Sequence, residues 1–120
     1  MTKKIKADIC IIGAGSGGLS VAAGAAQLGK KVVLLEGHKM GGDCLNFGCV
    51  PSKAMLAAGK TAQTFRDAGK YGIQPQDPQV DFRAVHDHVH SVIAAIEPND
   101  SVERFEGFGV QVIQEYGRFT

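Results

Sequence analysis

The sequence lacks tryptophan, has only two tyrosines and four prolines, and carries almost no net charge. Its 13 basic and 12 acidic residues leave a formal charge of +1, which argues against a nucleic-acid partner because such proteins present a basic face. No apolar run approaches the roughly 20 residues that a membrane span needs. Asp8 and several glycines interrupt the first apolar run, which excludes a secretory signal. We therefore expect a cytoplasmic protein without a membrane span.

Cysteine is also scarce, and three cysteines in 120 residues do not suggest a secreted disulfide scaffold. In a cytoplasmic protein a cysteine pair is more often catalytic or redox-sensing. Cys10 lies among isoleucines, so we expect it to be buried in the core. Glycine, in contrast, is abundant: the 16 glycines are about twice the average usage and cluster at 13–29 and 37–48. These clusters mark loops where the backbone approaches something closely.

Alternating strand and helix patterns predict an α/β fold. An apolar, β-branched run at 7–12, a helical pattern at 16–28 and a second apolar run at 31–36 form one βαβ unit. Such a unit is the building block of a Rossmann-like, doubly wound parallel sheet. The sequence therefore predicts part of such a sheet, with additional helices.

Beyond this βαβ unit over residues 7–36, the pattern predicts helices and a third strand. Pro51 suits the first turn of a helix, and Asp81 suits the N-cap of the next one. Pro98 is expected to end that helix, and Asn99 or Asp100 to cap a shorter one. The predicted segments are a redox loop and helix at 41–68, a linker at 69–80, helices within 81–107 and a strand at 109–114.

The six residues GAGSGG at 13–18 match the G-x-G-x-x-G pattern directly after a strand and at the start of a helix. Gly13 makes the tight turn, Gly15 lets the backbone approach a pyrophosphate, and Gly18 lets helix and strand pack closely. Phosphates would lie on the amides at the helix N-terminus. Glu36 ends the second strand, where its carboxylate suits the ribose hydroxyls and disfavours NADP. The motif predicts a dinucleotide site and leaves FAD and NAD open.

Cys44 and Cys49 form a second motif. On a regular helix their Cα atoms would lie roughly 8–9 Å apart, whereas a disulfide needs about 7 Å or less. They can therefore bond only if the backbone between them is distorted, which Gly48 makes easier. The alternatives are two buried apolar cysteines or half of a zinc site, although the C-x4-C spacing is not usual for zinc.

Two neighbours favour a reactive thiol at Cys49. It lies just before Pro51, near a predicted helix N-terminus, where the helix dipole favours the thiolate form. Lys53 follows four residues later and shares a helical face with the sulfur. The segment therefore predicts a redox-active pair.

The stretch GGDCLNFGCVPSK at 41–53 closely resembles the active-site signature of the FAD-dependent pyridine nucleotide-disulfide oxidoreductases. Its ending PSK resembles the dihydrolipoamide dehydrogenase and mercuric reductase branch. The resemblance implies that Cys44 is the interchange thiol, that Cys49 faces the flavin, and that Lys53 lies near the flavin N5 edge. It implies FAD as the cofactor of this site. The implied cofactor-binding residues are Gly13, Gly15, Ser16, Gly17, Gly18, Glu36, Gly37, Lys39, Gly42, Asp43, Cys44, Cys49, Lys53 and Gly117, the last beside the adenine.

The resemblance also implies what the whole protein does. Hydride passes from NAD(P)H to FAD, an electron pair reaches the cysteines, and thiol exchange follows with a small-molecule or protein-bound disulfide or dithiol. NAD(P) would bind a domain absent from this chain, and the enzyme would be a homodimer. We therefore expect the N-terminal part of an FAD-binding domain, inactive alone. The alternatives are mercuric reductase and a non-catalytic nucleotide-binding piece.

Some residues fit these interpretations less well. Asp43 stands where the family usually has threonine, close to the cofactor phosphates, and Phe47 replaces a smaller aliphatic residue. His86 and His90 lie one helical turn apart and are spaced to share an ion, but the pattern favours a pair that flanks an apolar stripe. We therefore expect no metal site.

Overall fold

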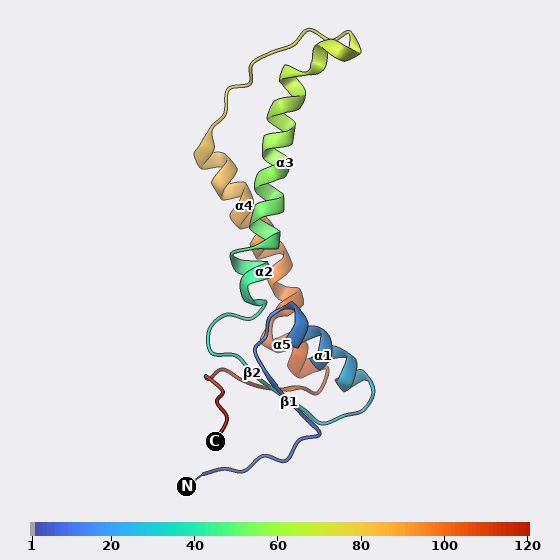
Figure 1. Cartoon of the computed structure of the whole chain (residues 1–120), viewed down its shortest axis with the longest axis vertical. Coiled ribbons are helices and arrows are strands. Elements are labelled where there is room, and N and C mark those ends of the chain that lie inside the picture. Colours follow the sequence, from blue (N-terminus) through green and yellow to red (C-terminus); the bar gives the residue numbers. More distant parts are fainter. Residues whose placement is uncertain (1) are drawn as a thin grey trace.

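A computed structural model describes residues 2–120 and shows an elongated molecule of 70 × 28 × 23 Å. An α/β body occupies one end, and a pair of long helices extends from it as an arm (Figure 1). The chain therefore consists of two regions with different packing.

The body contains a three-stranded parallel sheet in the order β1-β2-β3. Strand β1 is Ile9–Ile12, β2 is Val32–Leu35 and β3 is Gln111–Ile113. The helix α1 (Ser16–Gln27) connects β1 to β2, as the βαβ pattern predicts. The predicted α/β fold with parallel strands is confirmed.

The core of the body lies on one face of this sheet. Val32 and Leu34 alternate toward that face and are almost fully buried. Helix α1 covers them together with α5 (Val102–Gly107), whose Phe105 is also buried. The core residues are Ala14, Leu19, Ala22, Ala25, Val32, Leu34, Phe105 and Val110.

The prediction that Cys10 is buried is wrong. Side chains alternate across β1, and Ile9 and Ile11 pack against the core while Cys10 and Ile12 are exposed. Strand β1 is at the edge of the sheet, and its second face has little cover from the rest of the chain. An apolar run on a strand therefore does not by itself show that both faces of the strand are buried.

The arm begins with the short helix α2 (Gly42–Asn46) and continues in α3 (Cys49–Arg66). After a 3-10 turn, η1 (Ala68–Tyr71), the chain returns along α3 as α4 (Phe82–Ile96). Asp81 caps α4, since its Oδ1 accepts hydrogen bonds from the amides of Arg83 at 3.0 Å and Ala84 at 3.2 Å. This predicted cap is confirmed.

Helix α3 begins at Cys49, so Pro51 lies in its first turn as expected, where a proline without an N–H group is tolerated. One expected cap is corrected. Pro98 lies inside a second 3-10 turn, η2 (Glu97–Asp100), and the side chain of Ser101 caps α5 in place of Asn99 or Asp100. Asn99 and Asp100 both lie inside η2, so Ser101, the first residue after this turn, is the N-cap of α5.

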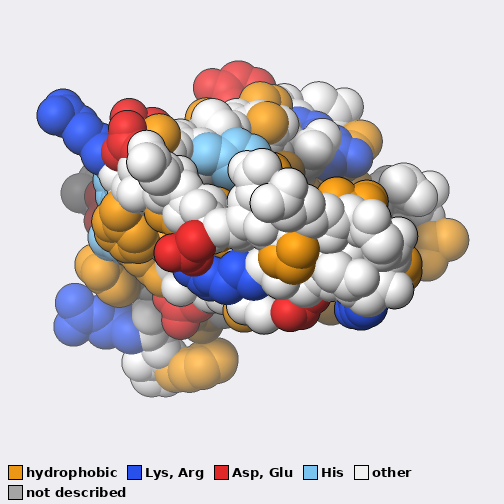
Figure 2. Space-filling view, turned by 90° about the horizontal axis from the view of Figure 1, so that it is seen from above, with side chains coloured by type: hydrophobic (Ala, Val, Ile, Leu, Met, Phe, Trp, Pro, Cys, Tyr) orange, Lys and Arg blue, Asp and Glu red, His pale blue; other side chains and the backbone are white. Residues whose placement is uncertain are grey.

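Large hydrophobic side chains remain exposed along the arm, among them Leu56, Phe65 and Phe82. Seen from the end of the arm, hydrophobic side chains reach the surface between basic and acidic ones (Figure 2). No helix within residues 2–120 combines the length and the apolar character that crossing a membrane requires.

Candidate functional site

The glycine turn after β1 has the geometry that its motif predicts. Gly13 adopts a φ of 104°, a conformation that favours glycine. A Cβ atom on Gly18 would collide with the carbonyl oxygen of Gly13, so only glycine permits this close approach of helix and turn. A Cβ atom on Gly15, in contrast, would meet no other atom within 4 Å. Gly15, the N-cap of α1, is therefore accessible to a ligand, whereas Gly18 is committed to packing.

Glu36 lies against this turn at the carboxyl end of β2. Its Oε2 accepts a hydrogen bond from the amide of Ala14 at 2.7 Å, and its Oε1 accepts one from the amide of His38 at 2.7 Å. The carboxylate thus joins the glycine turn to the loop after β2. The sequence predicted its place but not these two backbone contacts.

The redox segment is attached to the same turn. The amide of Gly41 donates to the carbonyl oxygen of Ala14 at 2.8 Å. A Cβ on Gly42 would come within 2.7 Å of the Gly15 Cα, and Gly42 also has a φ of 59°. Two glycines from the two motifs are therefore in direct backbone contact, which places the cysteine helix beside the nucleotide turn.

A hollow of about 300 Å³ lies where these segments meet. Five of its seven lining residues are predicted cofactor-binding residues, and they come from both motifs. The lining residues are Gly15, Glu36, His38, Lys39, Gly42, Asp43 and Phe47.

His38 and Phe47 were missed as possible ligand contacts. Their rings stack with centroids 6.3 Å apart and an interplanar angle of 27°. The ammonium nitrogen of Lys39 lies 5.6 Å from the centroid of the Phe47 ring, within cation–π range. Phe47, an unusual residue for this loop, could have pointed to this surface from the sequence. An exposed phenylalanine beside a lysine and a histidine forms a flat surface on which another ring can stack.

Cys44 and Cys49 lie on either side of a break between two helices, and both are free thiols. Cys44 belongs to α2, and Cys49 is the first residue of α3. A Cβ on Gly48 would come within 2.9 Å of the Asp43 carbonyl oxygen, so glycine permits the break. The segment 37–48, predicted as a glycine-rich loop, therefore contains the short helix α2, and the expected distortion between the cysteines lies at Phe47 and Gly48.

The two thiols interact directly. A hydrogen bond with the Cys49 side chain raises the pKa of Cys44, and desolvation and the charge of Cys49 act in the same direction. The ammonium group of Lys53 opposes this rise in the Cys44 pKa. Cys44 therefore keeps its proton to a higher pH than an isolated thiol would, since these causes raise its pKa.

Cys44 also lines a second hollow of about 430 Å³, bounded by α1 and α5. Ser16 lies in this hollow and not in the one between the two motifs. Gly13, Gly17 and Gly18 shape the turn without lining either hollow. Cys44 thus has one side toward Cys49 and another toward an open space.

Three further predicted residues lie away from both hollows. Lys53 is exposed on α3. Gly37 lies under the ring of Tyr116, and Gly117 lies against Ile12 and Leu35, so that a Cβ would come within 3.3 Å of the Ile12 side chain. These two contacts bring the C-terminal segment to the carboxyl ends of β1 and β2.

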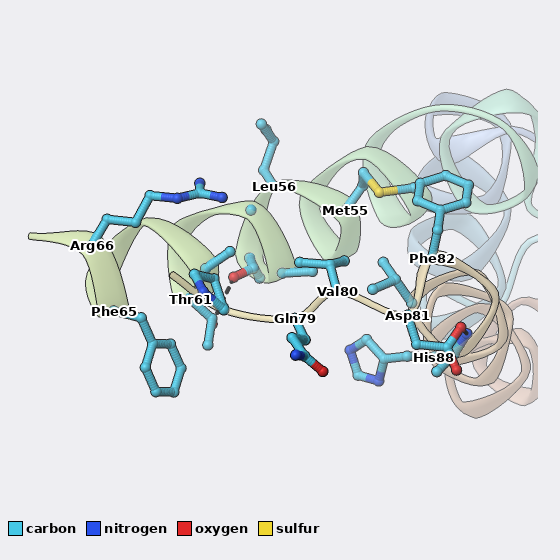
Figure 3. Close-up of a pocket in the computed structure, with 17 residues that line it drawn as sticks. Met55, Leu56, Thr61, Phe65, Arg66, Gln79, Val80, Asp81, Phe82 and His88 are labelled. Carbon is cyan, nitrogen blue, oxygen red and sulfur yellow. Dashed lines mark hydrogen bonds between the residues drawn. The ribbon is translucent and has the colours of Figure 1, made fainter. Parts of the chain in front are cut away.

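A hollow of about 910 Å³, larger than the two above, contains none of the predicted site residues. Figure 3 shows α3 along one side and the segment that leads into α4 along the other. Its lining is mainly apolar and includes Met55, Leu56, Phe65, Val80 and Phe82. This hollow belongs to the arm and is separate from the cysteine pair.

Comparison with known proteins defines the class. Residues 7–119 match the family model of the pyridine nucleotide-disulphide oxidoreductases, and the chain belongs to this family. In fold it is similar to the HOCl-induced flavoprotein disulfide reductase RclA from Escherichia coli, with a TM-score of 0.73 and 22% identity over 93% of this chain and 22% of that one.

Two curated relatives represent the two branches. A dihydrolipoyl dehydrogenase of Bacillus subtilis is 43% identical over 89 residues, which are 74% of this chain and 19% of the relative. A mercuric reductase of Streptomyces lividans is 33% identical over 114 residues, which are 94% of this chain and 24% of the relative. The chain therefore spans about a fifth to a quarter of the length of these relatives.

Proposed function

We propose that this chain is the FAD-binding and redox-cysteine part of a flavoprotein disulfide oxidoreductase, most like dihydrolipoyl dehydrogenase. The observation that supports this most strongly is the backbone contact between Gly15 and Gly42, because it joins a dinucleotide turn to a cysteine pair. Family membership and the flavoprotein fold neighbour support the same proposal.

The residues present fit a bound dinucleotide. Gly15 is open to an approaching group, and α1 has neither a side-chain cap nor an acidic residue in its first turn, so its amides suit a diphosphate. Glu36 would accept hydrogen bonds from ribose hydroxyls in addition to its two backbone contacts. The residues that would hold FAD are Gly13, Gly15, Ser16, Gly17, Gly18, Glu36, Gly37, Lys39, Gly42, Asp43, Cys44, Cys49, Lys53 and Gly117. When bound, FAD supplies two-electron exchange between NAD(P)H and a dithiol.

The cysteines supply the thiol chemistry. The thiolate of Cys44 attacks one sulfur of a substrate disulfide, releases the other as a thiol, and forms a mixed disulfide. Cys49 then attacks the Cys44 sulfur, the second substrate thiol leaves, and a Cys44–Cys49 disulfide remains. The protein pair has lost two electrons and two protons, and the substrate has gained them. Because the pKa of Cys44 is raised, its thiol must lose its proton before it can attack.

Mercuric reductase is the second candidate. Thiolates are soft ligands that suit Hg(II), and one of the relatives is a mercuric reductase. Asp43 and Phe47 depart from the usual family signature at the edge of the cofactor hollow, which favours a branch other than plain lipoamide reduction. A non-catalytic nucleotide-binding piece is the candidate from another class.

For the whole protein we propose a cytoplasmic homodimer that uses NAD(P) through a further domain. Its substrate would be a small-molecule or protein-bound disulfide or dithiol, without a nucleic-acid partner. Steady-state oxidation of NADH and NADPH by the whole protein tests this, with lipoamide and Hg(II) offered separately. Lipoamide-dependent turnover that Cys44→Ser abolishes is expected. Turnover with Hg(II) alone would select the second candidate, and turnover with neither would exclude both enzymes.

A further inference from the structure

His86 and His90 form a pair on the exposed side of α4. Their Nε2 atoms are 3.0 Å apart, and their ring centroids are 4.3 Å apart with an interplanar angle of 48°. Both residues are exposed, and neither lines the apolar hollow of the arm. The spacing in the sequence favoured two histidines that merely flank an apolar stripe. The structure instead brings the Nε2 atoms of both rings within hydrogen-bond distance of each other.

We propose that His86 and His90 chelate one divalent transition-metal ion through their Nε2 atoms. Imidazole–metal bonds are about 2.0–2.1 Å long, so nitrogens 3.0 Å apart correspond to an angle of about 91–97° at the metal. A tetrahedral ion with the same bonds would need the nitrogens about 3.3–3.4 Å apart. The geometry therefore suits tetragonal Cu²⁺ or Ni²⁺ better than Zn²⁺, and the Irving–Williams order places Cu²⁺ first.

The surroundings support this arrangement. Oδ1 of Asp87 lies 3.7 Å from Nδ1 of His86, the ring nitrogen that is not directed at the metal position. At this separation the carboxylate makes no hydrogen bond to the ring, but its negative charge adds to the attraction of a cation to the pair. The helix itself is anchored by the Asp81 cap.

Within residues 2–120 no group of three or more ligating side chains surrounds a common point. Two imidazoles and water in the remaining positions would therefore complete the coordination. This pair lies outside the hollow between the two motifs and away from the cysteines in the chain. The proposal is thus independent of the proposed function.

Thiols also bind Cu²⁺, so the test uses the chain with Cys10→Ser, Cys44→Ser and Cys49→Ser combined. Cu²⁺ alone is titrated, and electron paramagnetic resonance reports nitrogen ligation while ¹H–¹⁵N spectra report which amides broaden. One ion with two nitrogen ligands is expected, with broadening centred on α4. His86→Gln and His90→Gln should each weaken binding at least about tenfold.

His88→Gln is the matched control, since His88 is on the same helix but lines the apolar hollow. It should bind Cu²⁺ as tightly as the cysteine-free parent. Circular dichroism verifies that each glutamine variant keeps its helix. Equal binding by His86→Gln, His90→Gln and the parent would overturn the proposal, and so would an equal loss in His88→Gln or broadening confined to His38 or the N-terminus.

Discussion

In the α/β body the large aliphatic side chains Val32 and Leu34 are buried between strands and two helices, whereas on the arm Leu56 and Phe65 face solvent. Both regions have similar apolar residues at regular spacing. They differ because the body has helices on the core face of its sheet, while α3 and α4 pack mainly against each other. Apolar periodicity thus predicts which side chains share a face, and only the neighbouring elements determine whether that face is covered.

The largest expected difference between the two regions is in the effect of the same leucine-to-alanine substitution on stability. Leu34 is 0% exposed and Leu56 is 70% exposed. Leu34→Ala should lower the free energy of unfolding by about 2–5 kcal/mol, and Leu56→Ala by less than about 0.5 kcal/mol. Urea denaturation of both variants measures the difference. Similar losses would mean that the arm is covered in solution.

Glycines give a second test within the body. Gly18→Ala places a Cβ against the Gly13 carbonyl, and the resulting overpacking should cost about 1–3 kcal/mol. Gly24→Ala lies on the same helix, where nothing is within 4 Å, and should stabilise by about 0.5–1 kcal/mol. Denaturant unfolding compares the two variants. The free energy of unfolding should fall in Gly18→Ala and rise in Gly24→Ala. A fall in both variants would disprove the steric explanation.

The Glu36 carboxylate provides a smaller effect. Glu36→Ala removes the acceptor for the amides of Ala14 and His38, and should cost about 1–2 kcal/mol. Glu36→Gln keeps one acceptor oxygen and should lose about half as much. Thermal unfolding of both variants checks this order. An unchanged melting temperature in Glu36→Ala would show that these contacts do not hold the turn.

The cysteine pair should show its coupling in pH dependence rather than stability. The hydrogen bond with Cys49 raises the pKa of Cys44, so Cys49→Ala should lower that pKa and shift alkylation of Cys44 to lower pH. Lys53 acts in the opposite direction, so Lys53→Met should raise the Cys44 pKa and shift alkylation to higher pH. Iodoacetamide labelling followed by mass spectrometry measures both midpoints. Shifts in the same direction would contradict this arrangement.

Local signals in the sequence predicted the strands, the glycine turn and the Asp81 cap correctly, because each depends on residues a few positions apart. The exposure of Cys10 was not predictable from its apolar neighbours, since it depends on which face of β1 is covered. Helix α2 was not predicted because the glycines around it suggested a loop, whereas in the structure they allow close backbone contacts. Likewise, His38 and Phe47 join the candidate site only after folding brings the β2 loop and the redox segment together.

The most direct test is the visible absorbance spectrum of the purified chain with FAD, recorded before and after addition of a dithiol. If the residues between the two motifs hold FAD beside Cys49, the flavin band should gain a long-wavelength shoulder on reduction, and Cys49→Ala should abolish that shoulder. A chain that retains no flavin, or a shoulder that persists in Cys49→Ala, would contradict the proposed site.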